Sequence, residues 1–344
     1  MKKNRAIVLF LITALFLTSC VIREDEATQE HRLFTYITLY YFDTAIQIRL
    51  FARNRDEFDS YTQAIVSQIR HLHMLFDTFN EYEGINNIAT INRMAGIAPV
   101  AVEKEILELL SWGIEAYHNS GGGVNIAMGP VFDLWRSFLK NTDGGGPPSH
   151  DVLSAAASAA NFDDILLDFA AQEVFLRRPG MSLDVGALAK APALEAADAI
   201  AREMGVVSGF IYIGGDIKFI GAPLDGRDAW LAGINHPQGW PDGVSGAVFA
   251  KDTTVVSSGD SQRRRLYDGN VYHHIIDMST LMPARFYSHL VIVHPDARVA
   301  QFLSTAAFVL PSDDALFLVE SFEAQALWIT VDGDFFTTNG FDLQ

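Results

Sequence analysis

The stretch SLDVGALAKAPALEAADAIARE, Ser182–Glu203, places an acid, a glycine and a lysine directly before an alanine-rich helical pattern. We expect an apolar strand that ends at Asp184 and a helix that begins near Ala187. Backbone N–H groups at such a helix start attract anions, and Lys190 adds a positive charge beside them. The stretch therefore predicts a phosphate site, although a solvated lysine after a strand-loop-helix turn is also common.

The composition is that of a globular protein with a strong negative charge. The 344 residues are 49% hydrophobic and 19% charged, enough for one large α/β domain or two closely joined halves. The formal net charge of −17 argues against nucleic acid or an anionic membrane surface as the main partner, because both favour surplus Lys and Arg. An anionic ligand would need a local cation in its own site.

The N-terminus has the pattern of an export signal. Basic residues precede an apolar run, residues 6–17, that is too short to span a membrane comfortably, and LTSC follows, ending at Cys20. This order resembles a lipoprotein lipobox, with cleavage before Cys20 and acylation of its sulfur. A plain secretory signal with a chance cysteine is the alternative. Because Cys20 is the single cysteine of the chain, no disulfide is expected.

These features predict a signal peptide over residues 1–19, a lipid-anchored linker over residues 20–34 and one folded domain over residues 35–344. They predict an exported lipoprotein that is membrane-anchored, in the periplasm or at the outer face of the inner membrane. Within the domain, strand and helix patterns interleave without a repeat, which indicates an α/β or α+β fold of mixed sheets with packed helices. The loop GGGPPSHD, residues 144–151, could mark an insertion between two closely joined subdomains.

Local patterns define the expected elements. Apolar residues recur at helical spacing over residues 58–76, 104–120 and 297–310. Residues 36–51 alternate like a strand pair, and a closing hairpin is expected about Asp332 and Gly333. Further strands are expected over residues 163–169, 172–178, 180–185, 209–213, 214–221, 230–237, 246–260, 265–284 and 288–296.

Six segments occur in the order typical of one known family. They are VNIAMGPVFDLWRSF (124–138), SLDVGALAKAPALEAAD (182–198), FIYIGGDIKFIG (210–221), VVSSGDSQRRR (255–265), YHHIIDMSTLMPAR (272–285) and AQFLSTAAFVL (300–310). Together, from about Tyr36 onward, they resemble the ApbE family, the FAD:protein FMN transferases. The resemblance implies a T-fold-related core. It also implies an Mg²⁺-dependent reaction that cleaves the FAD pyrophosphate, passes FMN to a threonine of a membrane redox-complex protein and releases AMP.

The family pattern Asp-Leu-Gly-x-x-Ala-Lys-Gly is the most specific part of this resemblance. It matches Asp184, Gly186, Ala189 and Lys190. The match implies that Asp184 and Lys190 contact FAD and that the carbonyl of Ala187 binds the metal. Ala191 replaces the final glycine and Pro192 follows it, so the start of the helix is expected to differ locally.

Two further regions are similar to flavin-contacting segments of the family. The loop at Gly123, Val124 and Asn125 has Val and Asn where the family has Phe and Asp, and Asn125 can donate a hydrogen bond but carries no charge. Phe42 stands in the family's Met-Gly-Thr motif, and Phe79 stands where a Tyr is common. Either ring can stack on the flavin or belong to the core.

Polar candidates lie near the end of the chain. The resemblance places His274 and Ile275 in the flavin pocket, and His274 and Lys190 are the candidates for catalytic roles. Adjacent histidines on a strand point to opposite faces, so one of the pair at 273–274 is expected to be surface. Ser258 either donates to the ligand or belongs to an ordinary turn. The segment GGDI, residues 214–217, is interpreted as a structural turn.

The metal site is where the sequence departs from the family. Its members place an Asp four residues before a Thr, so that both face one side of a helix and bind Mg²⁺. Here the positions are Gln301 and Thr305, with Ser304 beside them. Gln301 offers a neutral carbonyl oxygen, whereas Mg²⁺ is normally bound through carboxylates and phosphates. The FAD pyrophosphate could supply the missing charge.

Three functions follow from the sequence. The first is a lipid-anchored FMN transferase that uses FAD and Mg²⁺. The second is an FAD-binding or FAD-hydrolysing lipoprotein that has lost the transfer step, for which Gln301 is the main support. The third is a transporter's substrate-binding lipoprotein, which the export signal and the α/β pattern alone would permit.

Overall fold

The N-terminal alternation folds into the first hairpin of a large sheet. The computed structural model describes residues 31–141, 144–234 and 246–344, so Cys20 and the expected signal lie outside the described residues. Strands β1 (Arg32–Tyr41) and β2 (Thr44–Ala52) pair antiparallel. The strand pair expected over residues 36–51 is confirmed.

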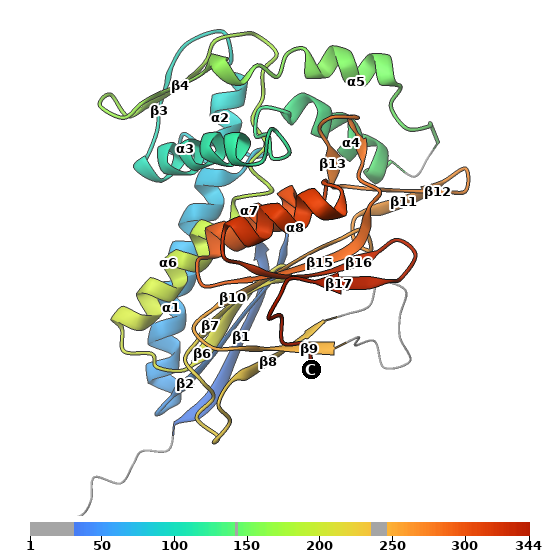
Figure 1. Ribbon diagram of the computed structural model, residues 1–344. Coiled ribbons are helices and arrows are strands. Elements are labelled where there is room, and N and C mark those ends of the chain that lie inside the picture. The colour runs from blue at the N-terminus through green and yellow to red at the C-terminus, as the bar shows by residue number, and fades with distance from the viewer. Residues whose placement is uncertain (1–30, 142–143, 235–245) are drawn as a thin grey trace, which may run out of the picture. The chain divides into compact units, whose positions relative to one another are not determined.

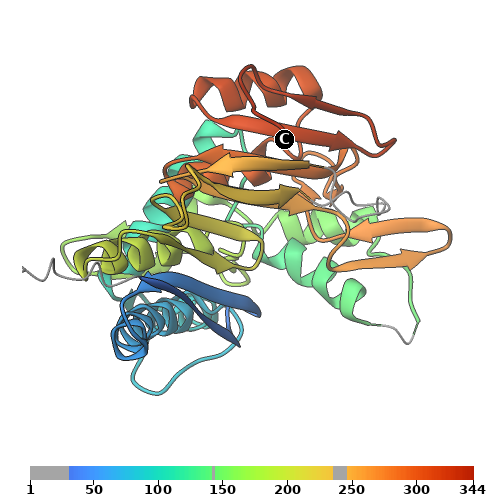
Figure 2. The same ribbon diagram turned by 90° about the horizontal axis from the view of Figure 1, so that it is seen from below.

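Eight strands form this sheet, in the order β1-β2-β6-β7-β10-β15-β16-β17. The remaining members are β6 (Gly209–Ile213), β7 (Asp216–Ile220), β10 (Thr254–Gly259), β15 (Tyr287–His294), β16 (Gln325–Thr330) and β17 (Phe335–Thr337). Every ladder within the sheet is antiparallel. Figure 2 shows the strands succeeding one another from the blue hairpin to the red C-terminal strands.

Three helices cover one face of the sheet (Figure 1). They are α1 (Arg55–Phe76), α6 (Lys190–Glu203) and α7 (Ala297–Ala306). The side chain of Asn54 caps α1 by accepting from the Glu57 N–H, which satisfies a backbone donor that the helix itself leaves unpaired. Their apolar faces and the strands beneath form the main hydrophobic core. This packing fixes the starts of α6 and α7 relative to β7.

The opposite face and one end of the sheet carry smaller units. The antiparallel pair of β8 (Trp230–Ile234) and β9 (Gly246–Ala250) packs against the large sheet and forms a second apolar cluster with it. A three-stranded sheet is formed by β3 (Val100–Ala101), β4 (Ile165–Asp168) and β5 (Glu173–Leu176). Helices α2 (Ile88–Arg93) and α3 (Lys104–Asn119) lie near this sheet.

A third apolar cluster joins two helices to a group of short strands. Its helices are α4 (Gly129–Lys140) and α5 (His150–Ala157). Its strands belong to the hairpin β11 (Arg264–Tyr267) with β12 (Asn270–His273) and the pair β13 (Ile276–Asp277) with β14 (Met282–Pro283). Trp135 of α4 stacks on Tyr272 of β12, with ring centroids 5.9 Å apart, and donates from Nε1 to the Leu281 carbonyl at 2.8 Å.

The structure differs from the sequence expectation at several elements. The strand expected over residues 180–185 is wrong, because that segment makes only an isolated bridge between Ser182 and Met128. The loop expected over residues 144–151 ends at Ser149, which caps α5. Helix α8 (Ser312–Ser321) was not foreseen. Among the described residues, no helix combines the length and the apolar character needed to cross a bilayer.

Candidate active site

Helix α6 begins at Lys190, one turn later than the sequence suggested. Residues 186–189 form a turn in which the N–H groups of Leu188 and Ala189 both donate to the Val185 carbonyl. The residue before the helix is Ala189, which provides no side-chain cap. The amide side chain of Gln301 on α7 caps the helix instead, because its Oε1 accepts from the Ala191 N–H at 2.7 Å.

The ammonium group of Lys190 is held by the neighbouring strand β7. Its Nζ lies 2.6 Å from Oδ2 of Asp216 and donates to the Gly214 carbonyl at 3.3 Å. The Asp216 side chain has no exposed surface, whereas that of Lys190 is 23% exposed. Burial raises the pKa of Asp216, and attraction to Lys190 opposes that rise. Lys190 thus offers a positive charge at the surface while its other side is anchored in the core.

The β6–β7 turn makes this contact possible. Gly214 and Gly215 both have positive φ, a conformation that glycine adopts without strain. A Cβ on Gly214 would lie 2.6 Å from Oγ1 of Thr44, so the β1–β2 turn packs directly against it. The segment GGDI does form a turn, but the role of Asp216 was missed. An acid inside the apolar strand DIKFI was the available signal, because a buried acid needs a partner.

Gln301 links these elements and is almost fully buried, at 3% exposure. Besides accepting from Ala191, it donates from Nε2 to Asp216 Oδ2 at 3.0 Å. Ser304 donates to the Gln301 carbonyl at 2.8 Å, and Ser258 of β10 donates to Ser304 at 3.1 Å. The structure therefore brings together three residues that the sequence singled out, and Thr305 follows half-buried on the same helix.

This donor set does not fit Mg²⁺ bound through Gln301. The amide oxygen already accepts a backbone N–H and the amide nitrogen donates to a carboxylate. A flipped amide would place its nitrogen against the Ala191 N–H and its oxygen against Asp216. The carboxylate that the fold does supply here, Asp216, already pairs with Lys190. The roles of Ala187, Ser304 and Thr305 toward a metal stay predictions.

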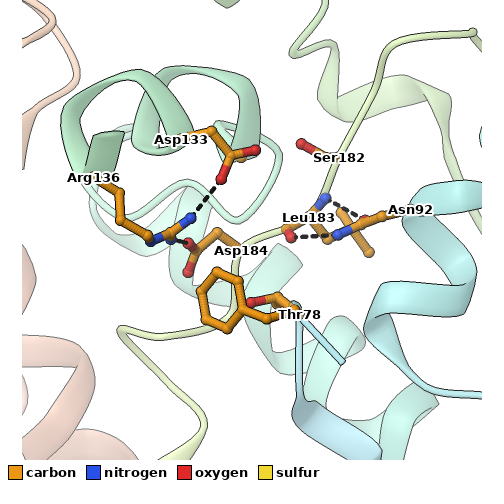
Figure 3. A pocket seen from close by; sticks show the side chains of 9 residues that line it. Thr78, Asn92, Asp133, Arg136, Ser182, Leu183 and Asp184 are labelled. Carbon is orange, nitrogen blue, oxygen red and sulfur yellow. Dashed lines mark hydrogen bonds and ion pairs between the residues drawn. The ribbon is translucent and has the colours of Figure 1, made fainter. Parts of the chain in front are cut away.

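The second part of the site surrounds Asp184. Its segment is extended but not part of a sheet, because the backbone of Leu183 is bonded to the side chain of Asn92 on α2. The Leu183 N–H donates to Asn92 Oδ1 at 2.6 Å, and Asn92 Nδ2 donates to the Leu183 carbonyl at 2.9 Å. The Asp184 N–H donates to the Ile126 carbonyl at 2.8 Å. Figure 3 shows Asp184 facing Arg136 of α4, which also pairs with Asp133. Asp184 further accepts from the Gly186 N–H at 2.8 Å, which shapes the turn before α6.

Phe79 is one of the residues that line a small pocket beside Asp184. The pocket is lined by Thr78, Phe79, Asn92, Gly129, Asp133, Arg136, Ser182, Leu183 and Asp184. The Arg136 guanidinium carbon lies 4.5 Å from the Phe79 ring centroid and Lys140 Nζ lies 5.8 Å from it, while the residue as a whole is 54% exposed. Such a ring is available to a second planar partner.

Phe42 occupies the β1–β2 turn, beside the glycines of the β6–β7 turn. It has positive φ, and its ring lies 5.5 Å from that of His73 with an edge-on geometry. Its N–H donates to His73 Nδ1 at 3.3 Å. Burial lowers the pKa of His73, which keeps that nitrogen available as an acceptor. Phe42 is therefore held by local contacts, and its contact with flavin stays a prediction.

The two adjacent histidines have different surroundings. His273 is 4% exposed, and its ring bridges the Ala284 carbonyl at 2.8 Å and the Ile275 N–H at 3.2 Å. His274 has exposed surface, as expected for one of the pair. Although the residue as a whole is exposed, the protein packed around its ring, followed by the charges of Arg263, His273 and Lys190, lowers its pKa to about 4. His274 is accordingly neutral at pH 7, near the Lys190 charge.

The remaining predicted residues lie deeper in the fold. Val124 and Ile275 belong to the main core, with 2% and 8% exposure. Asn125 accepts from the Ala127 N–H at 2.9 Å and so shapes the loop before α4. Gly123 packs against Ser120 and Val309. These positions shape the loop behind the site, and their contacts with a ligand stay predictions.

Comparison with known proteins identifies the fold and the family. The ApbE family model matches residues 42–328. The chain belongs to the ApbE family. An FAD:protein FMN transferase of Treponema pallidum (strain Nichols) is 32% identical over 259 residues, which cover 71% of each chain. The crystal structure of the ApbE protein of Thermotoga maritima is similar with a TM-score of 0.80 and 26% identity, covering 90% of this chain and 97% of that one.

A second solved structure supports the fold alone. The apo form of the Pseudomonas stutzeri flavinyl transferase ApbE has a TM-score of 0.76 at 18% identity, over 90% of this chain and 96% of that one. As an ApbE protein, the chain has the α/β architecture that was expected from its sequence, with a large antiparallel sheet at its centre. Its Lys190–Asp216 pair lies within the segment that the family model matches.

Proposed function

We propose that this ApbE protein transfers FMN from FAD to a hydroxyl group of an acceptor protein. The observation that carries the proposal is the Lys190 ammonium, partly exposed at the first residue of α6 and anchored by Asp216. The lysine charge suits a pyrophosphate, whereas the N–H of Ala191 at the start of the helix already donates to Gln301. Membership of the ApbE family and the name of the Treponema pallidum relative support FAD as the nucleotide.

The reaction exchanges the phosphoanhydride linkage of the FAD pyrophosphate for a phosphoester linkage to the acceptor. The acceptor oxygen forms a bond to the phosphorus of the FMN half, and the bond from that phosphorus to the bridging oxygen breaks. AMP leaves with the bridging oxygen, and the hydroxyl proton passes to a base. Such a transfer depends on positioning the attacking oxygen and on stabilising charge on the phosphate oxygens.

The described residues can divide these tasks. Lys190 would stabilise negative charge on the pyrophosphate, and the exposed ring of Phe79 would stack on a planar ring of the nucleotide. His274 has a pKa lowered to about 4, so its ring is neutral at pH 7 and free to accept a proton, although so low a pKa makes it a weak base. We assign it the base role because it lies near Lys190, whose charge contributes to that low pKa.

Three finer features belong to this proposal. The acceptor hydroxyl is that of a threonine in a membrane redox-complex protein, as the resemblance to the family implied. The mature chain is a lipoprotein attached through Cys20, which would keep the enzyme at the membrane beside such an acceptor. A requirement for Mg²⁺ remains part of the expectation, but Gln301 does not provide its ligand in the arrangement found here.

The test uses the full chain with FAD and a threonine-containing acceptor. The expected result is AMP in solution together with a covalent FMN adduct on the acceptor, seen by in-gel flavin fluorescence and mass spectrometry. Tight FAD binding without AMP, or AMP and free FMN without an adduct, would support the alternative. That alternative, an FAD-binding or FAD-hydrolysing protein without transfer, is favoured by the hydrogen-bonded state of Gln301.

A further inference from the structure

Gln301 contacts Lys190 through two neighbours and not directly. On one side its Oε1 accepts from the N–H of Ala191, the residue that follows Lys190. On the other side its Nε2 donates to Oδ2 of Asp216, the atom that also pairs with Lys190. One buried amide thus fixes both the backbone next to Lys190 and the carboxylate that anchors its ammonium.

The chemistry of an amide suits this place better than that of a carboxylate. A carboxylate at position 301 would accept from Ala191, but it would set a second negative charge against Asp216, which has no exposed surface. The amide nitrogen instead supplies a donor, and its hydrogen bond to a charged group in a buried setting is of the stronger kind. Lys190 then balances the single remaining charge.

The geometry also leaves Lys190 able to bind a ligand. An ammonium has three N–H donors, and two of them have acceptors in the fold, at Asp216 and Gly214. The Lys190 side chain keeps 23% of its surface exposed. Because Lys has four rotatable bonds, holding it in one rotamer costs conformational entropy. Because the Asp216 carboxylate already holds the Lys190 side chain, less conformational entropy is lost when a ligand binds.

We propose that Gln301 is a positioning residue that orients Lys190 toward the nucleotide pyrophosphate, and that it is not a metal ligand. The inference rests on FAD being the ligand, as in the proposed function. Gln301 acts through Asp216 and the start of α6, and it does not itself touch the substrate.

The first test is a double-mutant cycle on FAD affinity in the full chain, with Gln301→Met, Lys190→Met and the double variant. Gln301→Met should weaken FAD binding by about tenfold, the scale of one hydrogen bond to a charged group. In the Lys190→Met background the same change should alter the affinity less than about twofold, because the group that it orients is gone. Gln325→Met is the matched control, since the Gln325 side chain donates to the Gly340 carbonyl, at 3.0 Å. Equal losses in both backgrounds would overturn the proposal.

The second test covers the case in which Gln301→Met does not fold. In Gln301→Glu the carboxyl group can imitate the amide only when it is protonated, because it then donates to Asp216. FAD affinity of this variant should therefore recover toward the wild-type value as pH falls, while that of the wild type stays nearly constant. If the FAD affinity of Gln301→Glu changes with pH in the same way as that of the wild type over the whole pH range, the inference is wrong.

The metal part of the inference has its own readout. Mn²⁺ binding, followed by its electron paramagnetic resonance signal with FAD at a concentration that saturates each protein, should be the same in wild type and Gln301→Met. Loss of a bound Mn²⁺ in the variant would make Gln301 a ligand and overturn the proposal. Failure of the wild type to bind FAD at all would instead refute the proposed function, so the two failures are distinguishable.

Discussion

Nζ of Lys190 lies 2.6 Å from Oδ2 of Asp216, a carboxylate whose side chain has no exposed surface. Lys190→Ala should remove the partner of this buried charge and lower the free energy of unfolding by roughly 3 kcal/mol. It should also weaken FAD binding at least about tenfold, through loss of a charged group at the pyrophosphate. Chemical denaturation and a flavin fluorescence titration measure the two effects.

The control for this variant is Lys104→Ala. Lys104 forms an exposed i,i+4 pair with Glu108, and such pairs contribute only about 0.5 kcal/mol. FAD affinity should not change in Lys104→Ala. Unchanged FAD affinity in Lys190→Ala would remove Lys190 from the site, whatever its effect on stability.

The loss of stability in Lys190→Ala should depend on pH. The pKa of Asp216 is already raised by burial, and Lys190 restrains that rise. Without the ammonium the folded state holds its proton more tightly, so the variant loses stability as pH rises through the folded pKa of Asp216. The difference in melting temperature between wild type and variant should be smaller at pH 5 than at pH 8. A difference that does not vary with pH would contradict this account.

Phe79 provides a test of nucleotide stacking that is separate from stability. Because Phe79 is 54% exposed, Phe79→Ala should change the melting temperature little. It should weaken FAD binding by about tenfold if a flavin or adenine ring stacks there, in line with base–aromatic stacking of about 1–3 kcal/mol. Phe317→Ala on α8, where Phe317 is 76% exposed, is the control and should leave the affinity unchanged. Equal affinities in the two variants would place the nucleotide elsewhere.

Asn92 provides a test of the segment that carries Asp184. Asn92→Ala removes both side-chain hydrogen bonds to the Leu183 backbone and leaves those groups unpaired, at a cost of about 1–3 kcal/mol. FAD affinity should fall as well, because Asp184 loses its support. Asn86→Ala removes one exposed hydrogen bond to the Ala101 carbonyl and serves as the comparison. If the Asn92 variant loses stability but keeps its affinity, the position of Asp184 does not matter for binding.

His274 links activity and stability to pH. Its pKa is lowered from 6.5 to about 4, so the transfer rate should not fall through protonation of His274 until the pH approaches 4. The unfolded chain binds a proton at His274 more readily than the folded protein does. The stability that comes from neutral His274 is therefore present above pH 6.5 and is lost as pH falls through about 4. The wild-type melting temperature should drop more between pH 7 and pH 5 than that of His274→Asn. His150→Asn, at the start of α5, should follow the wild type.

The sequence predicted the parts of the fold that periodicity encodes. Helices α1, α3 and α7 and the first hairpin follow from regular apolar spacing. The segment over residues 180–185 was mistaken for a strand because its apolar pattern is strand-like. Its backbone hydrogen bonds go to Asn92 and Ile126, partners far away in the sequence that no local pattern reveals.

The site was predicted unevenly for a similar reason. Lys190 and Gln301 were found from motifs, but the link between them is Asp216, which lies on a strand that pattern analysis treated as structural. Hydrogen bonds between residues 85 and 110 positions apart require the folded chain. Arg136, the partner of Asp184, also came only from the structure.

The small cluster around Trp135 joins two ends of the site. Helix α4 presents Arg136 to Asp184 and Phe79, while the adjacent Trp135 packs on Tyr272, two residues before His274. We expect a change in this cluster to displace Arg136, which lies over Phe79, and the segment that carries His274 together. Variants found by selection for altered acceptor or nucleotide preference are therefore expected in this cluster as well as among the residues that face the ligand.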